Sequence, residues 1–174
     1  TVAGNVRMGL KYRPGLSEAE RKDIARDLIE TVGLGGFEDS YTNQISGGMR
    51  QRVAIARTLA ADPDVLLMDE PFGALDALTR EHLQTKLMEI NRAAGKTTIF
   101  VTHDVEEAIL IADRLIIFSS RPARVLEDLN IRDVLGQERD QSTRDEPAFL
   151  ALRRRVQTVI RAEHRQAEKI AHHA

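Results

Sequence analysis

Apolar residues recur at helical spacing in the first third of the chain. Between residues 18 and 32 they lie three or four positions apart on one stripe: Ile24, Ala25, Leu28, Ile29 and Val32. Ser17 and Glu20 form the capping-box pattern of a helix start, and Gly33 is a typical helix end. A second stripe over residues 49–60 follows two glycines and stops before Pro63. The pattern predicts two helices joined by a polar loop.

The hydrophobic pattern changes at residue 65. Residues 65–68 are a short, wholly apolar run, which is typical of a parallel strand covered on both faces. A helical stripe over residues 77–94 ends at Gly95, and further strands are expected at 97–102 and 115–118. Asp104 and Glu107 mark a short helix between these two strands. Strand and helix alternate, and this order predicts a doubly wound α/β unit with right-handed crossovers.

The last quarter of the chain has a different character. A turn over residues 119–123 leads to an expected extra strand near Val125, and residues 131–146 read as a polar, charged segment. A helix is expected after Pro147, with one apolar side: Phe149, Leu152, Val156, Val159 and Ile160. We therefore expect an α/β fold with a parallel sheet core. Its domains are a helical subdomain (1–62), an α/β core (63–130) and a C-terminal helical extension (131–174).

Composition narrows the classes of function. The chain has 174 residues, a formal net charge of −2 and no cysteine, so a disulfide framework and a thiolate metal site are excluded. The small net charge and the few aromatic residues (5 Phe, 2 Tyr, no Trp) argue against a nucleic-acid partner. Its apolar runs are far shorter than the roughly 20 residues that span a bilayer.

Acidic and imidazole side chains follow two of the predicted strands. Asp69 and Glu70 come directly after the first strand, and His103 comes after the second. Ligands of parallel α/β sheets bind at the carboxyl ends of the strands, so we expect these side chains to converge. An aspartate can hold Mg²⁺ through its water shell, a glutamate can polarise an attacking water, and a neutral histidine can contact a terminal phosphate. Each group alone would read as a polar turn or a helix start, whereas both together favour a phosphoryl-transfer site.

A serine and two glycines open the second predicted helix. Gly47 and Gly48 let a ligand come close to the backbone, and the free amides with the helix dipole behind Ser46 form an anion seat. The alternative is an ordinary serine-capped helix with glycines in its first turn.

These segments, in this order, resemble the ATP-binding subunits of ABC transporters. The resemblance is carried by ISGGMRQRVAIAR (45–57), VLLMDEP (65–71), FGALD (72–76) and VTHD (101–104), and it covers residues 1 to about 125. It implies a partial P-loop NTPase fold of the ABC ATPase type, with ATP and Mg²⁺ as ligands.

The same resemblance assigns a role to each candidate residue. Ser46, Gly47 and Gly48 would form the signature motif, and Asp76 the aspartate of the D-loop. Asp69 would be linked to Mg²⁺ through water, Glu70 would be the catalytic glutamate, and His103 the switch histidine. Two subunits of this family sandwich two ATP molecules. The signature motif and Asp76 are therefore expected to bind ATP largely across a homodimer.

Residues 49–52 and 72–80 look most like importers of nitrate, sulfonates and taurine. This narrower resemblance implies an ATPase at the cytoplasmic face of the membrane, peripherally bound to transmembrane permease subunits and served indirectly by a solute-binding protein. Residues 6–41 would contact the permease. ABC-type ATPases of DNA repair or translation are a weaker alternative, because the chain shows neither a coiled-coil arm nor a basic surface.

The pattern departs from that family in two places. Met49 stands where many relatives carry glutamine, so packing is its expected role. No phosphate-loop pattern occurs, because Gly95-Lys96-Thr97 has Ile90 where a glycine is required and precedes a strand. We expect the C-terminal portion of a cassette lacking the Walker A region, inactive by itself. The alternative is a non-catalytic, truncated docking or dimerisation module.

Overall fold

The computed structural model describes residues 1–171, apart from the side chains of Ala94 and of residues 166–171. The chain forms two compact units, one of residues 1–99 and one that begins at Phe100. The two units are defined by contacts between their residues. The expected domains 1–62, 63–130 and 131–174 were defined by motifs, and they stay a prediction.

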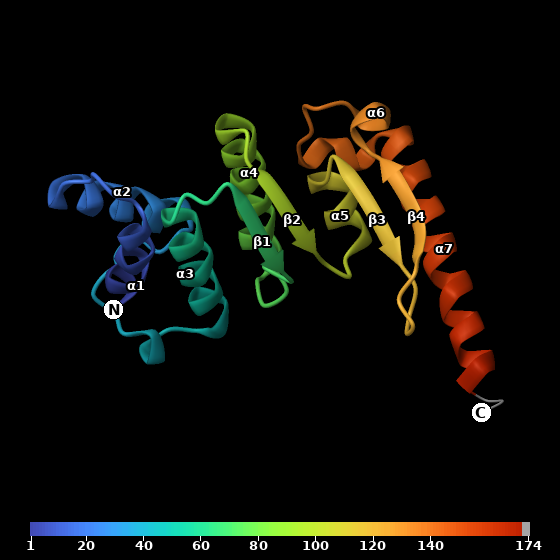
Figure 1. Ribbon diagram of the computed structural model, residues 1–174, viewed down its shortest axis with the longest axis horizontal. Coiled ribbons are helices and arrows are strands. Elements are labelled where there is room, and N and C mark those ends of the chain that lie inside the picture. Colours follow the sequence, from blue (N-terminus) through green and yellow to red (C-terminus); the bar gives the residue numbers. More distant parts are fainter. Residues whose placement is uncertain (172–174) are drawn as a thin grey trace. The chain divides into compact units, whose positions relative to one another are not determined.

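Helices make up the first part of the first unit (Figure 1). They are α1 (Val2–Gly9), the 3₁₀ turn η1 (Leu10–Tyr12), α2 (Glu18–Thr31), the 3₁₀ turn η2 (Thr42–Gln44) and α3 (Gly47–Ala60). The capping box at Ser17 and Glu20 is confirmed, and the predicted stripe of α2 is buried at Ala25 and Ile29.

Helix α1 was not predicted. It has eight residues, of which only Val2, Val6 and Gly9 are buried, so its apolar pattern is too short to recognise. Helices of this length are marginal alone. Helix α1 forms because it packs against α3, where a Cβ on Gly9 would come within 2.2 Å of the Arg57 carbonyl oxygen.

Strand β1 (Val65–Asp69), helix α4 (Ala77–Ala94) and strand β2 (Thr97–Val101) follow, close to the predicted bounds. Strands β1 and β2 pair with each other, and their arrows point the same way in Figure 1. The expectation that β1 is covered on both faces is wrong for this chain. Leu66 and Met68 are buried, whereas Val65 and Leu67 are 55% and 67% exposed, because the unit covers only one face of the strand.

The second unit contains α5 (Val105–Ile111), β3 (Arg114–Phe118), β4 (Val125–Asn130), α6 (Arg132–Leu135), the 3₁₀ turn η3 (Gln141–Asp145) and α7 (Pro147–Ala171). The extra strand near Val125 is confirmed as β4. It pairs antiparallel with β3, with Leu115 opposite Leu129. Within residues 1–171 the strands form two two-stranded sheets, β1 with β2 and β3 with β4, rather than the expected run of parallel pairs. The short link after Phe118 accounts for the antiparallel pairing of β4 with β3.

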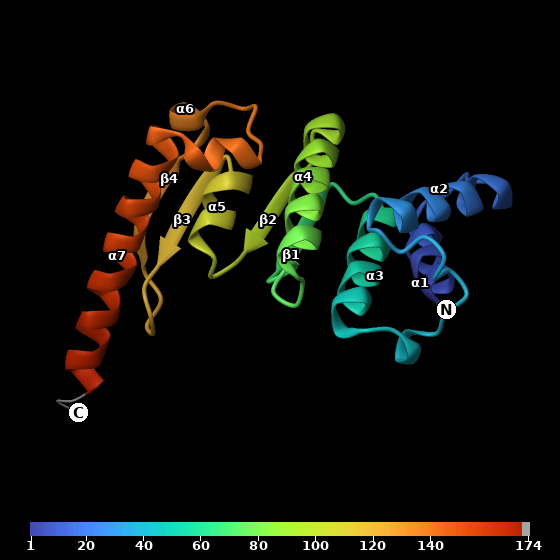
Figure 2. The same ribbon diagram turned by 180° about the vertical axis from the view of Figure 1, so that it is seen from behind.

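The C-terminal extension packs along the second unit. Helix α7 lies beside β4 in both views (Figures 1 and 2), with Phe149, Leu152 and Val156 buried as predicted. The segment before it was expected to be simply polar, but Ile131, Arg139 and Thr143 are buried. Within residues 1–171, no helix is both long and apolar enough to cross a bilayer.

Candidate functional site

The acidic pair lies where β1 ends. Asp69 is exposed, and its carboxylate makes no hydrogen bond or ion pair with any described residue. Glu70 is half-buried and has a φ of 47°, a left-handed conformation that is strained for a residue with a side chain. Its carbonyl oxygen accepts hydrogen bonds from Gln51 Nε2 (2.8 Å) and from the Gly73 amide (3.2 Å). The backbone therefore turns sharply at the expected catalytic glutamate, and a side chain of α3 fastens this turn.

Ser46, Gly47 and Gly48 form the start of α3, as predicted. Ser46 is the N-cap, and its hydroxyl accepts a hydrogen bond of 3.2 Å from the Met49 amide. The amides of Gly47 and Gly48 belong to the first helical turn, where helix geometry leaves N–H groups without a partner in the helix. This is the backbone arrangement that favours an anion.

Gly48 has a steric reason to be glycine. A Cβ there would lie 3.0 Å from the Ala74 carbonyl oxygen and 3.4 Å from Leu75 Cδ2, whereas a Cβ on Gly47 would meet nothing closer than 3.7 Å. The start of α3 thus packs directly against the segment between Glu70 and Asp76.

Asp76 is the N-cap of α4. Its carboxylate accepts a hydrogen bond of 3.1 Å from the Thr79 amide. This bond, followed by one from the Thr79 hydroxyl, lowers the pKa of Asp76, and the positive charge of Arg52 acts in the same direction. The aspartate is therefore ionised at neutral pH and takes part in holding its helix.

His103 lies in the second unit, is exposed, and immediately precedes Asp104, the N-cap of α5. The Asp104 amide donates to Thr102 Oγ1 (3.1 Å), which closes a tight turn around the histidine. Because Asp69 and Glu70 belong to the first unit, their expected convergence with His103 stays a prediction. Within the first unit, the structure does bring together Gly48, Glu70 and the segment up to Asp76.

Two residues of α3 that support the site were missed by sequence reasoning. Gln51 ties the helix to the Glu70 turn, and Arg52 donates to the carbonyl oxygens of Val32 (3.0 Å) and Gly33 (2.7 Å) at the end of α2. Their spacing carried a usable signal, since positions three and four residues after Gly48 share its side of the helix.

Gly95 and Lys96 do not form a phosphate loop. Gly95 ends α4 in the left-handed conformation (φ 60°), and Lys96 Nζ lies 3.1 Å from an Asp62 carboxylate oxygen. This agrees with the interpretation of the segment as the link between a helix and a strand.

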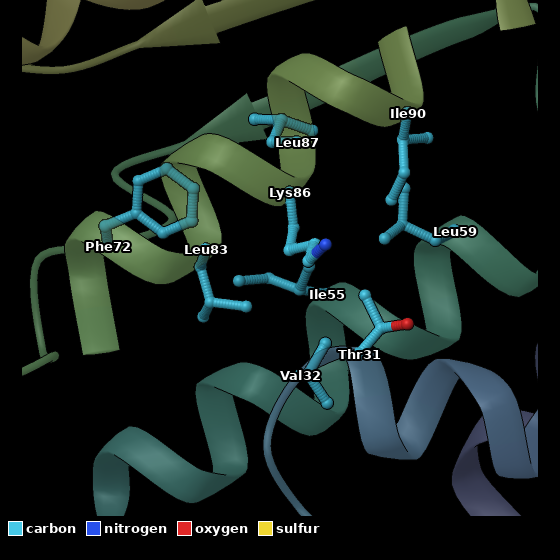
Figure 3. A pocket seen from close by; sticks show the side chains of 9 residues that line it. All are labelled: Thr31, Val32, Ile55, Leu59, Phe72, Leu83, Lys86, Leu87 and Ile90. Carbon is cyan, nitrogen blue, oxygen red and sulfur yellow. The ribbon is translucent and has the colours of Figure 1, made fainter. Parts of the chain in front are cut away.

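A small cavity in the first unit lies between α3 and α4, and its lining is mostly apolar (Figure 3). Leu83, Leu87 and Ile90 of α4 face Ile55 and Leu59 of α3 across a space of only about 10 Å³. This volume holds at most about one water molecule, so the cavity is a packing seam and not a ligand pocket. Among the described residues, no group of three or more His, Asp or Glu side chains could hold a metal ion.

Comparison with known proteins shows which family the chain resembles. Residues 1–73 match the ABC transporter family. The chain is 47% identical over 163 residues to an uncharacterised ABC transporter ATP-binding protein of Methanocaldococcus jannaschii, covering 94% of this chain and 59% of that protein. It is 46% identical over 158 residues to the taurine import ATP-binding protein TauB of Escherichia coli, covering 89% of this chain and 62% of TauB. The chain thus spans about three fifths of the length of these curated relatives.

A solved structure gives the same result. The ATP-binding cassette MJ0796, in a dimeric post-hydrolysis state bound to ADP and Pi, superimposes with a TM-score of 0.67 at 37% identity, covering 76% of this chain and 57% of that chain. The fold is therefore a partial ABC ATPase fold of the P-loop NTPase class. The resemblance to ATP-binding subunits of ABC transporters is confirmed, and relatives include a taurine importer subunit.

Proposed function

We propose that this chain is the hydrolysing and partner-facing portion of a subunit that uses ATP to energise import of a small solute, such as nitrate, a sulfonate or taurine, through an ABC transporter. One observation carries the proposal. The start of α3, with Gly47 and Gly48, packs directly against the segment that carries Asp69 and Glu70. Gln51 donates a hydrogen bond to the Glu70 carbonyl oxygen, and Gly48 lies against Ala74.

Each candidate residue has a proposed chemical task, including His103 of the second unit. Glu70 orients and deprotonates the attacking water, and the hydrogen bond from Gln51 to its carbonyl oxygen holds its backbone in place. The first-turn amides of Gly47 and Gly48 stabilise the negative charge that develops on the transferred phosphoryl group of an ATP held by the partner subunit. His103 steadies the terminal phosphate, and Asp76 contributes to the interface of the homodimer.

The donor set fits magnesium. The exposed Asp69 carboxylate has no partner among the described residues, so it is available to the water shell that Mg²⁺ retains in nucleotide sites. The magnesium ion would neutralise part of the negative charge of the ATP phosphates. No phosphate-loop pattern is present in the sequence, and the 174-residue chain alone is therefore not expected to bind Mg-ATP at micromolar concentration.

The relatives support the proposed transport role. A subunit of this class would act at the cytoplasmic face of the membrane, as a peripheral homodimer on transmembrane permease subunits, with a solute-binding protein delivering the solute. TauB is a taurine import ATP-binding protein, which supports a sulfonate or a similar anion as the solute.

The test is Glu70→Gln in a complete cassette that contains this chain. Loss of a general base lowers turnover by about 100-fold or more, while nucleotide binding is retained. Glu30→Gln, on the exposed side of α2, is the control and should hydrolyse ATP normally. Undiminished turnover in the Glu70 variant would contradict its role.

The second candidate is a non-catalytic docking or dimerisation module. The exposed apolar face of β1, with Val65 and Leu67, favours association of the chain by itself. Sedimentation of the 174-residue chain and of Leu67→Asp tests this function. Concentration-dependent dimers that the substitution abolishes support it, and a monomer at all concentrations speaks against it.

A further inference from the structure

The C-terminal extension packs against α5, the short helix that follows His103. Helix α5 has seven residues, a length at which an isolated helix is not stable in water. Its Ile109 and Leu110 are fully buried, and it packs against both η3 and α7, whose Phe149 is also fully buried. The conformation of α5 therefore depends on residues after position 140.

Two arginines of the extension hold the first turn of α5. Arg153 Nη1 lies 2.7 Å from Glu106 Oε1, and Arg144 Nη1 lies 3.4 Å from Glu106 Oε2. All three side chains are about one quarter to one third exposed: 34% for Arg153, 26% for Arg144 and 35% for Glu106. Partly buried, charge-assisted contacts of this kind restrain a helix more than exposed surface pairs do.

The far end of α5 is held in the same way. Arg139 is buried, and its Nη2 donates a hydrogen bond of 3.0 Å to Asp113, two residues after the helix. The Asp113 carbonyl oxygen accepts the amides of Ile131 (2.9 Å) and Arg132 (3.2 Å). The extension thus restrains α5 at both ends.

The restrained turn is coupled to His103 through the backbone. Asp104 accepts the amides of Glu106 (3.0 Å) and Glu107 (3.2 Å), and its own amide closes the turn around His103 onto Thr102. Any shift of the Glu106 peptide displaces the Asp104 cap, and with it the imidazole one residue before.

We propose that Arg153, assisted by Arg144, is a positioning residue for His103: it fixes Glu106, and thereby sets where the loop carrying the imidazole begins. The effect on catalysis rests on the role proposed for His103, whereas the effect on the α5 loop stands on the contacts alone.

The first experiment measures hydrogen exchange in the 174-residue chain. Arg153→Gln should accelerate exchange of the Glu106 and Glu107 amides by about tenfold, and Arg153→Lys should restore part of the protection. Arg154→Gln is the matched control, since Arg154 is exposed and forms no ion pair with any described residue. Amides of the paired strands β3 and β4, in the same unit as Arg153, report whether each variant is folded. Unchanged exchange in a folded Arg153→Gln chain would overturn the proposal.

The second experiment measures ATPase activity in the complete cassette. Arg153→Gln should lower kcat with little change in KM for ATP. Arg153→Lys should restore part of kcat, and Arg154→Gln should leave kcat and KM unchanged. His103→Gln distinguishes the catalytic role proposed for His103 from the positioning role proposed for Arg153. If His103→Gln abolishes turnover but Arg153→Gln leaves kcat unchanged, the positioning proposal fails alone. If His103→Gln hydrolyses ATP normally, the role of His103 in the proposed function fails, and the exchange result still decides the structural part.

Discussion

Replacing Gly9 by alanine should destabilise the first unit, although alanine is the better helix former. Gly9 has helical dihedrals (φ −59°, ψ −38°), so no backbone reason requires glycine there. An added Cβ would stand 2.2 Å from the Arg57 carbonyl oxygen and 3.0 Å from the Ala60 Cβ. Carbon and oxygen normally approach to about 3.3 Å, so α1 and α3 must separate by about 1 Å.

The magnitude follows from two opposing effects. Overpacking of this kind costs about 1–3 kcal/mol, and more where the obstacle is backbone. The gain in helix propensity returns less than about 1 kcal/mol at a helix end. We expect a net loss of about 2 kcal/mol, which is roughly a thirtyfold faster exchange of the buried α3 amides.

Hydrogen exchange resolves this effect because it reports each unit separately. The matched control is Gly4→Ala in the same helix, where a Cβ would meet only the Thr1 hydroxyl at 3.2 Å. That variant should be neutral or slightly stabilising. If the α3 amides of Gly9→Ala exchange as slowly as those of Gly4→Ala, the close approach of α1 to α3 is not as described.

Three further outcomes are expected. Gly48→Ala should loosen the contact with Ala74 and accelerate exchange across residues 70–76, whereas Gly47→Ala should not, because only the former places a Cβ against that carbonyl oxygen. Arg52→Gln should destabilise the α2–α3 contact by about 2 kcal/mol in urea unfolding, because it removes charged hydrogen bonds to the end of α2. Hydrogen bonds from the Ser17 hydroxyl and amide lower the pKa of Glu20, so their stabilisation is present above the unfolded pKa of about 4.3 and is lost as the pH falls through the lower folded value. Glu20→Gln should therefore show a weaker loss of stability on acidification, measured by unfolding at pH 7 and below pH 4.

The candidate site was predictable wherever a motif coincides with the end of an element. Ser46 and Asp76 are both N-caps in the structure, and Asp69 ends its strand as expected. The spacing of Gln51 from Gly48 places it on the site's side of α3, but its hydrogen bond to Glu70 was not predictable, because a contact between residues 19 positions apart depends on how α3 packs. The convergence of His103 with the acidic pair stays a prediction.

Local chemistry in the sequence determined the helices with capping signals, the apolar stripes, the strands and the order of the motifs, because hydrogen bonding and periodicity act within a few residues. Tertiary structure alone decided the rest. Helix α1 exists because Gly9 fits against Arg57, β3 pairs with β4, and Glu106 is held by arginines about 40 residues away. The contacts of α1 and of Glu106 depend on close packing between segments far apart in the sequence, which no short pattern of residues encodes.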